Sequence, residues 1–184
     1  VLLRSGIPPR GQYLCFALRR WKGFEEKAPI FGAAAEYAYR TYGLTPVFVA
    51  VEKHLDPGAG QLAARGLTIP HYFLNDAGSA GTIIGALSRM QAVVSMRLHA
   101  LIFAAGQGIP LAGVVYDPKV SAFLRYIGQD LFVDLADLTE TDLRSMIDQC
   151  VAQAAHPETQ EAAVRTLQAM EHKNVEVARR LLKS

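Results

Sequence analysis

The feature of this chain that most constrains its fold is the alternation of short apolar runs with helical patterns. Six runs of strand-forming residues are separated from one another by helical patterns, and no two of them are adjacent in the sequence: 12–18, 46–51, 71–74, 92–95, 110–115 and 131–133. Such alternation is typical of βαβ units. We therefore predict an α/β fold, a doubly wound and mostly parallel six-stranded sheet.

The intervening helical patterns carry recognisable ends. The first spans 24–42 and is followed by Gly43, a natural terminator. The third runs to Met90 after potential capping residues, and its Gly81 and Gly85 suggest close packing against the sheet. The remaining helices are expected at 57–65, from the end of the fourth strand to 106, at 121–127 and at 139–155.

A common strand order for such sheets, 3-2-1-4-5-6, places strands one and four side by side where the chain reverses direction. Arg19 follows the first strand and Arg97 follows the fourth. Because parallel strands end at one edge of the sheet, the two guanidiniums are predicted to meet at one crevice. A pair of guanidiniums suits a carboxylate or a phosphate.

The segment 93–105 reads V-V-S-M-R-L-H-A-L-I-F-A-A, a buried strand followed at once by a helix. Arg97 and His99 lie in the turn between them. The first amides of a helix add positive potential at such a turn. This segment therefore predicts an anion site.

Composition excludes several other classes. The 184 residues are 51% hydrophobic and 20% charged, and the net charge of +2 without a basic tract gives no argument for nucleic acid. The longest apolar run is too short for a transmembrane segment. Cys15 and Cys150 are predicted to be buried thiols, and the sequence shows neither a metal-ligand cluster nor a nucleotide-binding P-loop.

We expect three parts along the chain. Residues 1–11 contain Pro8 and Pro9 and read as a linker from a missing N-terminal domain. Residues 12–156 form the α/β domain, and 157–184 form a C-terminal helix packed on it. A partner domain is thus expected to precede the chain.

Two motifs resemble the polysaccharide pyruvyl transferase family. They are M-R-L-H-A-L-I-F-A and Y-D-P-K-V, which a strand separates within 95–123. The strand followed by arginine at 16–21 is also similar, so the resemblance covers most of 13–133.

The resemblance implies a GT-B architecture, in which two Rossmann-like domains face each other across a cleft. This chain would be the C-terminal, donor-binding half, and the missing half would help to hold the acceptor. Known members transfer pyruvate from phosphoenolpyruvate to a sugar diol, forming a cyclic ketal and releasing phosphate. For this chain we expect no cofactor, with phosphoenolpyruvate as the donor substrate. The resemblance further implies synthesis of a cell-surface polysaccharide, on a free or lipid-linked acceptor, in the cytoplasm at the inner face of the membrane.

The family's phosphoenolpyruvate motif maps onto Arg97, Leu98 and His99. Arg19 or its neighbour Arg20 corresponds to an upstream arginine, and the sequence leaves both open. His99 is either an acid that protonates the methylene carbon or the departing phosphate, or only a ligand contact.

Asp117 and Lys119 follow the fifth strand at the same predicted edge. Asp117 is a candidate to orient or deprotonate an acceptor hydroxyl, and Lys119 a candidate to add charge near the phosphate. The alternative is a turn held by Asp117 and Pro118, with Lys119 in solvent. Trp21 either stacks on a sugar or packs at a hinge.

Two other functions compete with pyruvyl transfer. One is a GT-B glycosyltransferase domain that binds a nucleotide-sugar, with Glu52 as a candidate for the ribose. The other is a Rossmann-like binding module without catalysis. Titration with phosphoenolpyruvate and with UDP-sugars separates pyruvyl transfer from glycosyl transfer.

Overall fold

The computed structural model describes residues 2–156 and, beyond them, 164–165, 167–169, 171–172, 175 and 179–182. Within this part, six strands form one sheet in the order β3-β2-β1-β4-β5-β6, and every neighbouring pair is parallel. The predicted fold class and strand order are confirmed. The strands are β1 (Tyr13–Ala17), β2 (Thr45–Val49), β3 (Tyr72–Leu74), β4 (Ala92–Ser95), β5 (Leu111–Val115) and β6 (Phe132–Asp134).

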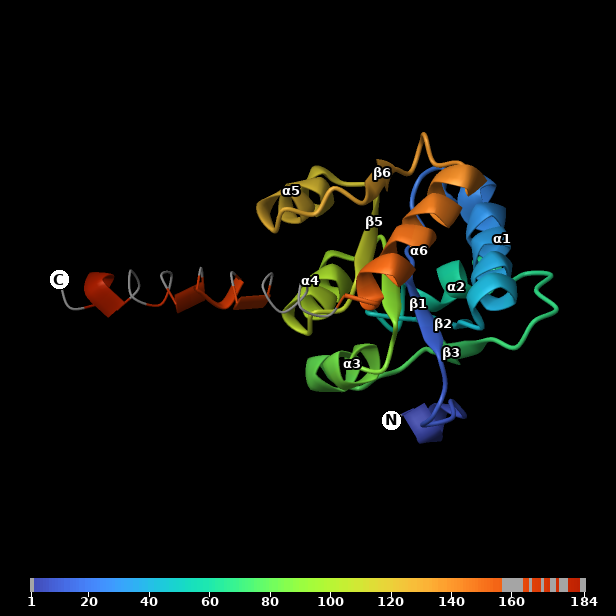
Figure 1. Ribbon diagram of the computed structural model, residues 1–184, viewed down its shortest axis with the longest axis horizontal. Helices are drawn as coiled ribbons and strands as arrows, with labels where there is room; N and C mark the ends of the chain where they lie inside the picture. The colour runs from blue at the N-terminus through green and yellow to red at the C-terminus, as the bar shows by residue number, and fades with distance from the viewer. Residues whose placement is uncertain are drawn as a thin grey trace.

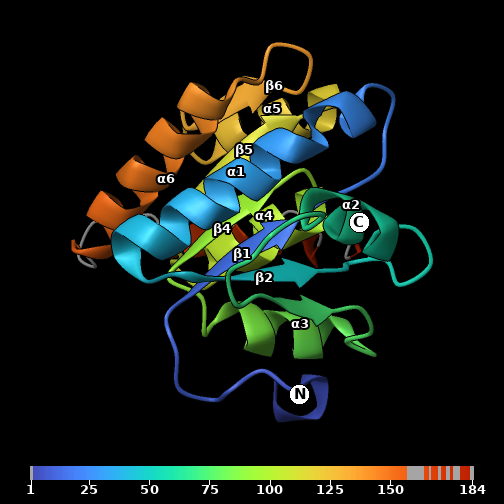
Figure 2. The ribbon, with the colours of Figure 1, turned by 90° about the vertical axis from the view of Figure 1, so that its right-hand side faces the viewer.

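Helices cover both faces of the sheet (Figures 1 and 2). One face carries α1 (Phe24–Tyr42), α2 (Pro57–Ala63) and α6 (Glu140–Ala154). The other carries α3 (Ala80–Leu87), α4 (Leu98–Gly106) and α5 (Pro118–Tyr126). This arrangement is the predicted doubly wound fold.

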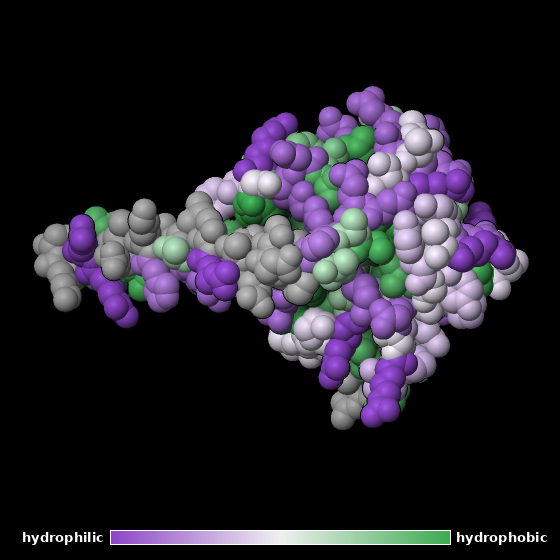
Figure 3. Space-filling model, in the orientation of Figure 1, coloured by the Kyte–Doolittle hydropathy of each residue, from purple (hydrophilic) through white to green (hydrophobic). Residues whose placement is uncertain are grey.

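Strand residues are buried on both faces because helices lie above and below them. Leu14 and Phe16 of β1 pack under α1, whereas Cys15 and Ala17 pack on the opposite side. Both cysteines, Cys15 and Cys150, are free and buried, as predicted. On the face shown in Figure 3, hydrophilic and intermediate residues cover most of the surface, and hydrophobic residues form small separate patches.

Helix α5 begins earlier than the predicted residue 121, and the reason is its cap. The Asp117 carboxylate accepts a hydrogen bond of 3.0 Å from the Lys119 amide, and Pro118 occupies the first helical position. The same Asp-Pro pair that indicated a turn therefore starts the helix.

The expected close packing at Gly81 and Gly85 is wrong. A Cβ at Gly85 would meet no atom within 4 Å, and one at Gly81 would meet only the Ser79 hydroxyl, at 3.9 Å. The close approach lies at Gly32 of α1 instead. A Cβ there would stand 2.6 Å from the carbonyl oxygen of Ala63, at the end of α2.

The N-terminal stretch expected to be a linker contains a short 3-10 helix, η1 (Leu2–Ser5). Ile7 is fully buried in the hydrophobic cluster on the α3 side, and the Tyr13 hydroxyl donates to the Pro8 carbonyl oxygen at 2.7 Å. These residues thus pack on the domain. Apart from scattered positions, the predicted C-terminal helix at 157–184 lies outside the described residues.

Candidate functional site

The site is built at the carboxyl edge of the sheet, where β1 and β4 end together. Ala17 and Ser95 are register partners, and the Met96 amide donates to the Ala17 carbonyl oxygen at 3.0 Å. Arg19 and Arg97 each follow two residues later, so both leave the same edge. The predicted shared edge is therefore confirmed, whereas the meeting of the two guanidiniums in one crevice stays a prediction, because neither lines the two hollows described below.

Ser95 shapes the turn between β4 and α4, and it is one of the buried polar residues of the domain. Its hydroxyl oxygen accepts a hydrogen bond of 2.8 Å from the Arg97 amide. The same hydroxyl lies 3.2 Å from the Ala17 carbonyl oxygen and 3.0 Å from that of Arg97. These contacts hold Arg97 in an extended conformation at the start of the helix.

Arg97 forms an ion pair that the sequence did not predict. Its Nε lies 3.3 Å from Oδ2 of Asp56, and the two side chains are only 11% and 1% exposed. The Asp56 carboxylate also accepts a hydrogen bond of 2.8 Å from the Glu52 amide. Burial raises the pKa of Asp56, and the Glu52 amide together with the charges of Arg97 and Arg19 opposes this rise. The only signal for Asp56 in the sequence is its place directly before Pro57, as a potential helix cap.

Two polar atoms of this pair have no partner of their own. Among the described residues, Nη1 of Arg97 and Oδ1 of Asp56 are buried without a hydrogen-bond partner. The first-turn amides of α4, those of Leu98, His99 and Ala100, have no preceding helical turn to donate to. This end of α4 therefore combines a fixed guanidinium with helix N-terminal donors, a combination that suits an anion.

Arg19 lies against two aromatic rings at the same edge. Its guanidinium carbon is 5.5 Å from the ring centroid of Trp21 and 5.9 Å from that of Tyr116. Its charge also opposes the burial-driven rise in the pKa of Asp56, and it adds to the causes that lower the pKa of Asp117. Arg19 thus acts electrostatically on both sides of the edge.

Arg20 has a different environment. Its side chain is 58% exposed and pairs with Glu25 of α1. The structure therefore separates the two adjacent arginines, with Arg19 at the aromatic rings and Arg20 at the surface.

Asp117 and Lys119 adopt the turn arrangement that stood as the alternative to a catalytic role. One carboxylate oxygen of Asp117 caps α5, and the other lies 3.2 Å from the Lys119 ammonium. The hydrogen bond from the Lys119 amide is the main reason that the pKa of Asp117 is lowered. Both oxygens of Asp117 are thus occupied by Lys119.

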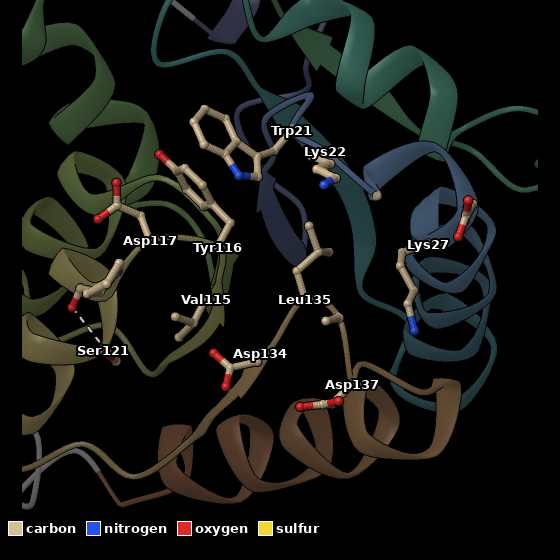
Figure 4. A pocket seen from close by; sticks show the side chains of 14 residues that line it. Trp21, Lys22, Lys27, Val115, Tyr116, Asp117, Ser121, Asp134, Leu135 and Asp137 are labelled. Carbon is tan, nitrogen blue, oxygen red and sulfur yellow. Dashed lines mark hydrogen bonds between the residues drawn. The ribbon is translucent and has the colours of Figure 1, made fainter.

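Among the hollows along this edge, two are lined by candidate residues that follow the strands or begin α4. The larger, about 710 Å³, is lined by residues that follow β1, β5 and β6, including Trp21 and Tyr116 (Figure 4). The other, about 460 Å³, is lined by residues that follow β2 and β3 and by His99 and Phe103 of α4. His99 is exposed and has open space beside it, but its hollow is not the one that Trp21 lines.

Two negative findings concern only the part of the chain that the structure describes. No group of three or more acidic, histidine or cysteine side chains has the geometry to hold a metal ion. None of the described helices combines the length and apolar character that a membrane crossing requires.

An all-parallel sheet in this order, with its candidate site at the carboxyl edge, defines a doubly wound Rossmann-like domain. Solved structures share this fold. The glycotransferase of kitacinnamycin aligns with a TM-score of 0.61 at 15% identity, over 88% of this chain and 40% of that one. Glycosyltransferase VinC, solved in complex with dTDP, aligns with a TM-score of 0.59 at 18% identity, over 94% of this chain and 43% of that one.

A putative UDP-N-acetylglucosamine 2-epimerase from Listeria monocytogenes gives a TM-score of 0.56 at 16% identity, over 95% of this chain and 48% of that one. The chain thus spans less than half the length of these relatives, and the likeness concerns the fold of one domain. The family model of polysaccharide pyruvyl transferase matches residues 1–118, and the chain belongs to this family. No curated protein matches the sequence.

Proposed function

We propose that this chain is the donor-binding part of an enzyme that transfers pyruvate from phosphoenolpyruvate to a sugar diol. The observation that supports this most is the guanidinium of Arg97, held by Asp56 at the start of α4 in a member of the pyruvyl transferase family. The acceptor belongs to a cell-surface polysaccharide, free or lipid-linked, and a preceding domain completes the cleft. The enzyme acts in the cytoplasm, at the inner face of the membrane.

Phosphoenolpyruvate is small and carries both a carboxylate and a phosphate. Nη1 of Arg97 and the amides of Leu98 and His99 are donors close together in the chain, and Arg19 brings a second positive charge to the same edge. Asp56 neutralises part of the charge of Arg97, but it also fixes the direction of the guanidinium. Arg19 and the helix N-terminus supply the remaining positive potential.

Ketal formation makes two new C–O bonds at C2 of the donor and breaks two bonds there, the C=C π bond to the methylene carbon and the C–O bond to phosphate. Protonation of the methylene carbon makes C2 electrophilic, and one acceptor hydroxyl adds to it. The second hydroxyl then replaces phosphate. Of the two hydroxyl protons, one balances the new methyl group and the other leaves with phosphate. His99, exposed beside an open hollow, is the proposed proton donor.

The arrangement supports Arg19 rather than Arg20 as the second donor contact, because Arg20 is exposed and paired with Glu25. Asp117 and Lys119 serve in this proposal as the cap of α5. No cofactor besides the donor substrate enters the proposed reaction.

A nucleotide-sugar is the second candidate ligand. Glu52 lines the hollow that His99 also lines, so a carboxylate is available there for a ribose hydroxyl. Calorimetric titration of the chain with phosphoenolpyruvate, and separately with UDP- and dTDP-sugars, tests the proposal. We expect heat of binding with phosphoenolpyruvate that weakens with salt, and none with the nucleotide-sugars. The opposite pattern would replace pyruvyl transfer by glycosyl transfer.

A further inference from the structure

The larger hollow, which Trp21 and Tyr116 line, lies beside the proposed donor site and has no part in it. It is formed where the chain leaves β1, β5 and β6 at the carboxyl edge. In Figure 4, the rings of Trp21 and Tyr116 lie on one side of it, and the carboxylates of Asp134 and Asp137 lie on the opposite side. Its volume of about 710 Å³ is sufficient for a sugar ring.

The aromatic side of the hollow is continuous with Arg19. The ring centroids of Trp21 and Tyr116 are 5.1 Å apart, and the guanidinium of Arg19 lies within 6 Å of both. Trp21 nevertheless remains 47% exposed. A large ring left exposed in a hollow offers an apolar surface to a ligand, and the C–H face of a pyranose is a surface that such a ring can cover.

The charges around the hollow argue against an anionic ligand. Four carboxylates and two ammoniums line it, and one of those ammoniums, on Lys27, donates to the Leu138 carbonyl oxygen at 2.9 Å. Apart from the capping Asp117, the carboxylates of Asp134 and Asp137 are exposed and have no ion-pair partner among the described residues. Ionised carboxylates are acceptors only, so they favour a ligand that donates hydroxyl hydrogens and disfavour a phosphate.

We propose that this hollow binds a neutral pyranose of the acceptor, with its face against Trp21 and its hydroxyls donating to Asp134 and Asp137. The acceptor role rests on the proposed pyruvyl transfer, whereas sugar binding itself does not. Because Arg19 lies against Trp21 and Tyr116, a sugar in this place lies beside the proposed donor site. The C-terminal domain then contributes to acceptor binding as well as to donor binding.

Trp21 is the only tryptophan of the chain and lines this hollow, so its fluorescence should respond to a ligand bound there. The probes are methyl β-D-galactopyranoside and methyl α-D-mannopyranoside, titrated into the intact chain to high millimolar concentration. We expect a saturable change in Trp21 emission with at least one of them. Replacing both carboxylates, Asp134→Asn with Asp137→Asn, should weaken this binding by about tenfold. Asp130→Asn is the matched control, because Asp130 is exposed close to β6 and lies outside the hollow.

Calorimetry with phosphoenolpyruvate on the same protein separates the two proposals. Sugar binding without donor binding would retain the site and remove its role in pyruvyl transfer. Donor binding with no response of Trp21 to either glycoside would overturn the site. So would an equal effect of Asp130→Asn and of the double variant, or a saturable response of Trp21 to UDP with none to the glycosides.

Discussion

Arg97 and Asp56 form an ion pair between the end of β4 and the loop after β2, with Nε of Arg97 3.3 Å from Oδ2 of Asp56. Since both side chains are almost completely buried, the pair replaces solvation that each charge has lost. The pair therefore fixes a guanidinium at the start of α4, and it makes the stability of the domain depend on both partners.

Asp56→Ala should lower the free energy of unfolding by about 3 kcal/mol or more, because it leaves the Arg97 charge buried without a partner. Urea denaturation of the variant and the parent measures this difference. The control is Asp76→Ala, which removes the exposed partner of Lys53, 3.8 Å away, and should cost no more than about 1 kcal/mol. Equal losses of unfolding free energy in the two variants would show that the buried pair contributes no more to stability than the exposed pair.

Arg97→Ala and Arg19→Ala should each weaken phosphoenolpyruvate binding by roughly 1.5–3 kcal/mol, because each removes a charge-assisted contact. Calorimetric titration of each variant measures the loss. Arg20→Ala is the matched control and should bind as the parent does, because Arg20 is exposed and paired with Glu25. A loss at Arg20 with none at Arg19 would reassign the second contact.

The lowered pKa of Asp117 predicts that the stability of the domain depends on pH. This pKa is lowered from 3.8 in the folded chain, mainly by the Lys119 amide, so the folded state binds fewer protons than the unfolded state as the carboxyl titrates. The stabilisation is therefore present above 3.8 and lost as the pH falls through the lowered pKa. Thermal unfolding of the parent and of Asp117→Asn should differ at neutral pH and converge in acid. A difference that persists in acid would contradict the role of this carboxylate.

Gly32→Ala should destabilise the domain by about 1–3 kcal/mol, because the new Cβ would lie against the Ala63 carbonyl oxygen and push α1 away from α2. Gly85→Ala is the matched substitution in a helix with open space around it, and it should stabilise by about 0.5–1 kcal/mol. Urea denaturation of both variants measures the contrast. A Gly32→Ala variant that is more stable than the parent, together with a Gly85→Ala variant that is less stable, would contradict the packing of α1 on α2.

Much of this architecture could be predicted from the sequence, because the pattern of apolar residues determines which backbone segments form strands and which form helices. The alternation of apolar runs with helices predicted a parallel sheet, and the strand order followed from the commonest topology, so the shared edge of Arg19 and Arg97 was predictable. The start of α5 was not predicted, because an Asp-Pro pair begins both turns and helices.

The partner of Arg97 was not predictable either. Asp56 lies in a loop, and nothing in its local pattern shows that a side chain far away in the sequence will bury it. The separation of the two hollows was also missed, since their walls come from loops whose paths the strand pattern leaves open. The binding roles of Arg19, Arg97, Leu98 and His99 remain predictions.

A crystal structure of the chain with phosphoenolpyruvate bound tests the central claim most directly. We predict ligand oxygens within hydrogen-bond distance of Nη1 of Arg97 and of the Leu98 and His99 amides, with Arg19 turned toward the second anionic group. A donor bound away from the start of α4, with Nη1 of Arg97 still without a partner, would contradict the account.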